Sequence, residues 1–136
     1  MVSKEKDTPF YHFHNANPKG KNANDCVYRA ISVALGQDYA TTMRELTEFA
    51  IKLGYAPNEN KTMKAYMESK GWITMKEPRD HNNKKISVQK FLRMVNPAEV
   101  IVANVGSHHT SLIKEGRIWD TWDCSKNTMH IYWRKD

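Results

Sequence analysis

Apolar residues recur at helical spacing around the first cysteine of the chain. From Cys26 to Leu35 they fall at intervals of three and four residues, which places them on one face of a helix. Asp25 stands where a capping residue is preferred, and Gly36 stands where helices commonly stop. The pattern therefore predicts a helix over 26–35 that begins at the cysteine itself.

The same helical period continues through the next part of the chain. Thr41 or Thr42 is a suitable cap for a second helix, and Ser87 for the last of the series. The expected ranges are about 41–53, 60–69 and 86–95. Together with the helix at the cysteine, this predicts a helical region that ends before Pro97.

The pattern changes after Pro97 to short β-branched and alternating runs. The expected strands cover 100–105, 108–113, 117–122 and 128–133. The second and third are close enough in sequence to form a hairpin around Gly116. Helices followed by neighbouring strands are typical of an α+β fold, here with N-terminal helices packed on a C-terminal antiparallel sheet.

Chain length and composition indicate one globular domain. The 136 residues are 40% hydrophobic and 26% charged, which is ordinary for a domain with its own core. We expect one domain over 1–136, with a flexible start over 1–9. No apolar run is long enough for a membrane span, and the first residues have no apolar signal region, so we expect a cytoplasmic protein without a membrane partner.

The net charge of +6 is compatible with an acidic partner such as nucleic acid. The lysines and arginines are scattered, however, and acidic residues interrupt them. No nucleic-acid-binding motif accompanies them. We therefore expect a solvated basic surface rather than a nucleic-acid groove, and a protein or peptide as the partner.

Cys26 is the residue whose position calls for a chemical explanation. A thiol at the start of a helix meets unpaired backbone N–H groups and the positive end of the helix dipole, and both favour the thiolate. The second cysteine, Cys124, is expected to be a semi-buried thiol without a role. Two cysteines do not make a disulfide framework, which suits a reducing compartment.

The expected hairpin supplies a base and a carboxylate for such a nucleophile. Asp120 lies on the returning strand, and Asp123 is an alternative carboxylate further on. With a three-residue loop, strand alternation puts His108 on the face of Asp120; with a two-residue loop, the partner is His109. The loop length decides the base, and the pattern alone leaves it open.

Two segments resemble known thiol peptidases. The run N-D-C-V-Y-R-A-I-S around Cys26 is similar to the nucleophile motif of papain-like peptidases, especially the ovarian-tumour class of deubiquitinases. The segment H-H-T-S-L resembles the histidine strand of that class, which implies that His108 is the base, with His109 as the alternative. The layout of the whole chain also resembles a family of small phage-encoded papain-like proteins.

The resemblance implies a papain-like fold and a cysteine peptidase that cleaves peptide or isopeptide bonds with Cys26, His108 and Asp120. The glutamine that often donates to the oxyanion in such enzymes is missing upstream of Cys26, so Asn22 and Asn24 are the expected substitutes. The alternative is a phage-encoded binding protein that inhibits a host defence complex without catalysis.

No cofactor is required by either function. His12 and His14 lie on one face of a short alternating stretch, but no further ligand at a suitable spacing accompanies them. The sequence therefore predicts no metal.

Overall fold

The computed structural model describes residues 6–136, and these form an α+β domain. Ten helices and strands follow one another along these residues. They are β1 (Tyr11–Phe13), α1 (Cys26–Leu35), α2 (Tyr39–Leu53), α3 (Asn60–Ser69), β2 (Trp72–Met75), α4 (Val88–Leu92), β3 (Ile101–Val105), β4 (His109–Lys114), β5 (Arg117–Asp120) and β6 (Met129–Lys135).

One mixed sheet forms the centre of the domain, with the strand order β1-β5-β4-β3-β6-β2. The four strands after Pro97 pair antiparallel, as predicted. The expectation of a purely antiparallel, C-terminal sheet is wrong at both edges. There β1 pairs parallel with β5, and β2 pairs with β6. The alternation around His12 was visible, but three residues in β1 and four in β2 are too few to predict a strand or its partner from sequence.

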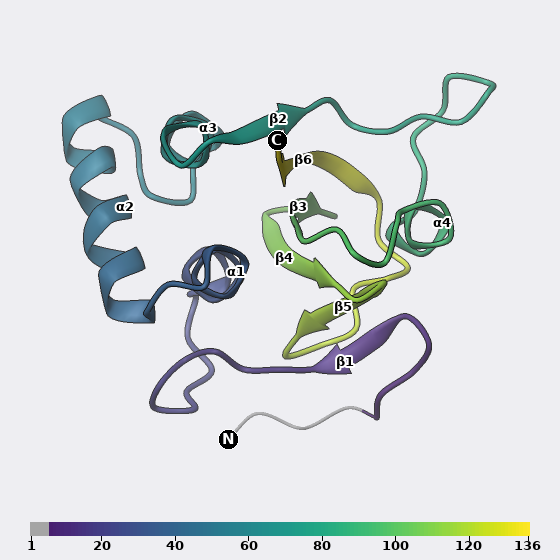
Figure 1. The fold of residues 1–136 in the computed structure, drawn as a ribbon, viewed down its shortest axis with the longest axis horizontal. Coiled ribbons are helices and arrows are strands. Elements are labelled where there is room, and N and C mark those ends of the chain that lie inside the picture. Colours follow the sequence, from purple (N-terminus) through teal and green to yellow (C-terminus); the bar gives the residue numbers. More distant parts are fainter. Residues whose placement is uncertain (1–5) are drawn as a thin grey trace.

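The helices cover the two faces of this sheet unequally (Figure 1). α1, α2 and α3 lie on one face, and α4 lies on the other. Successive side chains of β3 point to opposite faces of the sheet. Val102 packs on the face covered by α1–α3, and Ile101 and Ala103 pack on the face covered by α4. The sheet is therefore buried on both faces, and α1 lies directly on β4.

The helix at Cys26 has the predicted bounds, and so does α3. Gly36 ends α1 with a left-handed φ of 62°, which a glycine adopts without strain. The predicted caps of α2 are wrong: the helix begins at Tyr39, and Asp38 caps it by accepting a hydrogen bond from the Thr41 N–H. Ser87 caps α4 as predicted, although α4 is shorter than expected.

The start of the chain is only partly described. Residues 1–5 of the expected flexible segment 1–9 lie outside the described residues. Of the rest, Asp7 accepts hydrogen bonds from His12 and from the Phe13 N–H, so it is attached to β1.

Candidate active site

Cys26 occupies the first position of α1 and is half-buried. The first N–H groups of a helix have no partner within it. Asp25 stands at the N-cap, but its side chain makes no capping hydrogen bond to them. The thiol therefore lies at the start of the helix, as predicted, but the predicted capping by the Asp25 side chain is wrong.

The turn between β4 and β5 decides which histidine accompanies Asp120. Lys114 pairs with Arg117, so the turn has two residues, Glu115 and Gly116. Their φ values of 55° and 74° are both positive, as a type I′ turn requires. This register aligns Asp120 with Ser111, whose Oγ donates to Asp120 Oδ2 over 2.6 Å.

His109 lies on the same face of β4 as Ser111 and is the partner of Asp120. Its Nε2 is 2.7 Å from Asp120 Oδ2. The prediction that His108 shares a face with Asp120 is wrong, because the loop is one residue shorter than that prediction needs. His108 instead lies before β4 with a left-handed φ of 61°, at the rim of the cavity beside Cys26.

Asp120 is almost fully buried, with 2% of its surface exposed, and hydrogen bonds occupy both carboxylate oxygens. In addition to Ser111 and His109 on Oδ2, Oδ1 accepts from Arg29 Nη1 over 2.9 Å and from the Thr121 N–H over 2.7 Å. Four donors hold the charged form of the carboxylate at the end of β5. Asp120 is thus fixed in position and charge.

These contacts shift the three titrating groups in a consistent way. Burial alone would lower the pKa of His109, but its hydrogen bonds to Asp120 and to the cysteines raise it to about 11. Burial alone would raise the pKa of Cys26, but hydrogen bonds from His109 and the Thr110 N–H bring it below its ordinary value. Burial also opposes ionisation of Asp120, and the contact with His109 outweighs it, so that its pKa is lowered. All three shifts are toward the charged forms: imidazolium, carboxylate and thiolate.

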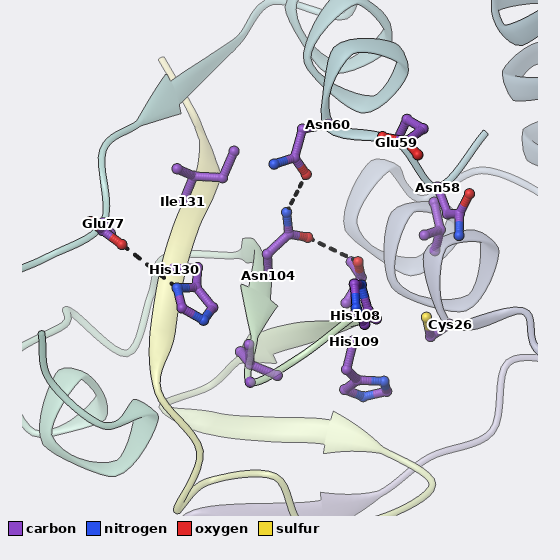
Figure 2. Close-up of a pocket in the computed structure, with 14 residues that line it drawn as sticks. Cys26, Asn58, Glu59, Asn60, Glu77, Asn104, His108, His109, His130 and Ile131 are labelled. Atoms are coloured by element: carbon purple, nitrogen blue, oxygen red, sulfur yellow. Dashed lines mark hydrogen bonds and ion pairs between the residues drawn. The ribbon is translucent and has the colours of Figure 1, made fainter. Parts of the chain in front are cut away.

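Two open cavities of about 470 and 490 Å³ meet at Cys26. Figure 2 shows Cys26 and Asn58 on one side of the first cavity, and Glu77 with His130 on the other. The residues that line both cavities are Cys26, Val27, Asn58, His108 and His109. A ligand can therefore extend in two directions from the thiol.

The predicted oxyanion residues Asn22 and Asn24 line the second cavity, next to Cys26. Asn58 lies in the loop between α2 and α3 and lines both cavities. Sequence reasoning missed it, since only the packing of α2 and α3 brings this loop to Cys26. Trp122 also lines the second cavity, and the centroid of its ring lies 4.8 Å from that of the His109 ring.

Cys124 is the second thiol near His109. One side-chain atom each of His109, Asp120 and Cys124 lies within 4.8 Å of the other two, a spacing that can suit a metal ion. Asp120, however, already accepts four hydrogen bonds, one of them from a guanidinium, and Cys124 is fully buried. The arrangement is that of a hydrogen-bonded cluster.

The remaining candidates have other partners. His12 Nδ1 lies 2.7 Å from Asp7 Oδ2, and the rings of His12 and His14 pack on Trp119. Asp123, the alternative carboxylate, accepts a hydrogen bond from the Ser125 N–H in the turn after β5. Cys26, His109 and Asp120 are therefore the candidate residues that the structure brings together.

No family model, no curated protein and no solved structure matches this chain significantly. Among residues 6–136, none of the helices has both the length and the apolar character needed to cross a membrane.

Proposed function

We propose that this protein is a papain-like thiol hydrolase that cleaves peptide or isopeptide bonds with Cys26, His109 and Asp120. The observation that supports this most is the row formed by the three side chains: Asp120 binds His109 Nε2 over 2.7 Å, and His109 contacts the Cys26 thiol at a cavity. A nucleophile, a base and a group that orients the base are the parts this chemistry needs.

The first half of the reaction forms an acyl-enzyme. The Cys26 thiolate attacks the carbonyl carbon of the substrate, and the carbonyl oxygen becomes an oxyanion. The backbone N–H groups at the start of α1 are suitable donors to it, and Asn22, Asn24 and Asn58 supply further amides around the cavities. Imidazolium His109 then gives its proton to the leaving nitrogen, the C–N bond breaks and a thioester remains on Cys26.

The second half restores the enzyme. With Nε2 bound to Asp120, Nδ1 is the nitrogen of His109 left to take a proton from water. The hydroxide equivalent adds to the thioester carbon, the C–S bond breaks and the acid product leaves. Cys26 is thereby released as the thiolate beside an imidazolium. No step requires a cofactor.

The cavities favour a protein or peptide over a nucleic acid as the substrate. Arg29 is the only lysine or arginine among the described residues that line the two cavities at Cys26, and two carboxylates already bind it. Phosphates need free cations, whereas asparagine amides suit the groups of a polypeptide backbone. If the resemblance to phage-encoded proteins holds, a host protein is the substrate.

An ester substrate tests the proposal before the natural substrate is known. With p-nitrophenyl acetate, we expect a burst of one nitrophenolate per chain and an acetyl group on Cys26 by mass spectrometry. Cys26→Ser should abolish the burst, and Cys124→Ser, the matched control, should keep it. Rapid alkylation of Cys26 without any burst would contradict hydrolysis and leave the non-catalytic binding protein as the function.

A further inference from the structure

Arg29 connects the nucleophile helix to the carboxylate of the hairpin. Its side chain is 11% exposed, and its guanidinium lies between two buried carboxylates. Nε donates to Asp25 Oδ1 over 2.9 Å, and Nη1 donates to Asp120 Oδ1 over 2.9 Å. Arg29 follows Cys26 by three residues on α1, so the thiol and the Arg29 side chain lie on the same side of the helix.

Asp25 is held on its far side as well. Its Oδ2 accepts from the Tyr39 hydroxyl over 2.7 Å and from Asn17 Nδ2 over 2.9 Å. These contacts explain why Asp25, at the N-cap position, does not cap α1 with its side chain. The carboxylate is used to fix Arg29 instead.

The ionised side chains form a row in which the sign of the charge alternates. The order is Asp25, Arg29, Asp120, His109 and Cys26, and the Cys26 thiol, which is negative when ionised, lies at the cavity. Three further titratable groups interact with this row: His14, Tyr39 and Cys124. Burial lowers the pKa of His14, which feels the charge of Arg29, and burial raises the pKa values of Tyr39 and Cys124.

We propose that Arg29 is a positioning residue that fixes Asp120 against α1 and sets the pH range over which the Cys26–His109 ion pair exists. A buried cation favours the deprotonated form of every neighbouring group, so Arg29 lowers the pKa of the thiol and of the imidazolium together. The inference rests on the proposed function for its meaning in catalysis, but its test measures only ionisation.

Two titrations measure the ionisation of the Cys26 thiol and of the His109 imidazole. The rate of Cys26 alkylation by iodoacetamide gives the midpoint at which the thiolate forms, and NMR of labelled histidines gives the midpoint at which His109 loses its proton. In Arg29→Gln we expect both midpoints to move to higher pH, by about one pH unit. Arg44→Gln removes the same charge from an exposed site on α2 and should move neither.

A purely structural role for Arg29 predicts a different result. If Arg29→Gln only separated the side chains, the thiol midpoint would rise while the imidazolium midpoint fell toward its ordinary value near 6.5. Midpoints that move in opposite directions, or not at all, would overturn the inference. Because Arg29→Gln leaves two carboxylates buried, Arg29→Lys serves as the variant that keeps the charge, and it should leave both midpoints close to those of the wild type.

Asp25→Asn tests the row from its other end. The change keeps the size of the side chain but removes a negative charge beside Arg29, so both midpoints should move to lower pH. A wild-type thiol that titrates near pH 8.5 would instead overturn the proposed function itself. If the wild-type protein has the ion pair but the two midpoints do not rise in Arg29→Gln and fall in Asp25→Asn, only the role of Arg29 is overturned.

Discussion

The two cysteines contact the same imidazole and yet differ in their chemistry. Cys26 lies at the start of α1, half-buried at the meeting point of two cavities. Cys124 lies in the turn after β5, with none of its surface exposed, in the core under α4. Both hydrogen-bond to His109, but the pKa of Cys26 is lowered and that of Cys124 is raised.

Burial and the remaining neighbours account for the difference. Burial raises the pKa of the Cys124 thiol more than the hydrogen bond from His109 can lower it, and the charge of Asp120 raises it further. Cys26 has the Thr110 N–H and the charge of Arg29 in addition to His109. A neighbouring histidine therefore does not by itself identify a reactive thiol; solvent access and the sign of the surrounding charges decide.

The largest expected effect comes from Asp120→Asn, which removes the carboxylate that bonds to Arg29 and His109. Asparagine has nearly the same shape as aspartate, so this change would leave stability unaffected if Asp120 made no ion pair. In the structure, however, Asp120 forms an ion pair with Arg29. Breaking one partner of such a pair leaves a buried charge, so we expect a loss of about 3–5 kcal/mol in the free energy of unfolding. Urea denaturation measures it.

Asp123→Asn is the matched control for that change. Asp123 lies in the segment after β5 and accepts a hydrogen bond from the Ser125 N–H. Its loss should cost about 1 kcal/mol. Equal losses in the two variants would mean that the bond from Asp120 to Arg29 contributes nothing to stability.

The next effect separates the two histidines and, with them, the two thiols. In His109→Ala, Cys26 loses the partner that lowers its pKa. At pH 6.5 the thiolate fraction of a thiol with a pKa near 8.5 is about 1%, so the alkylation rate should fall roughly 10- to 100-fold. His108→Ala should change the rate by less than about 2-fold, because the structure pairs His109, and not His108, with Asp120.

The pH profile of alkylation gives the counter-test for the histidines. If His108→Ala lowers the alkylation rate of Cys26 as much as His109→Ala does, the pairing of His109 with Asp120 is not what lowers the pKa of the thiol. If neither variant slows it, Cys26 owes its reactivity to the helix start alone.

The smallest effect concerns Cys124. In the folded protein, iodoacetamide should modify one thiol per chain, at Cys26, and only unfolding should expose the second. Cys124→Ala should cost about 1–2 kcal/mol of stability, through the small cavity left in the core under α4. It should leave the alkylation rate of Cys26 unchanged. Two modified thiols in the native protein, by mass spectrometry, would remove the contrast between the cysteines.

Local signals in the sequence predicted those parts of the fold that depend on neighbouring residues. The bounds of α1 and α3 follow from helical spacing that ends at glycine. The strands β1 and β2 were missed, because such short edge strands exist only through pairing with β5 and β6. The class α+β could be predicted; the mixed sheet could not.

The site shows the same division between local and distant information. Cys26 and Asp120 could be identified from the pattern, but the choice of histidine depended on one residue of turn length. The spacing of Asp25 and Arg29, four residues apart on one helix, is a visible signal for an ion pair that was not used. Asn58 has no such signal, since its place at the cavity depends on how α2 and α3 pack.

The order of the strands also has a consequence for when the protein can become reactive. Tyr11 pairs with Ile118, so this edge of the sheet forms only after more than a hundred further residues have been synthesised. Contacts between such distant segments form slowly, whereas the local helix at Cys26 can form early. The early helix therefore carries Cys26 as an ordinary thiol, and the contacts with His109 and Thr110 that lower its pKa form only with β4.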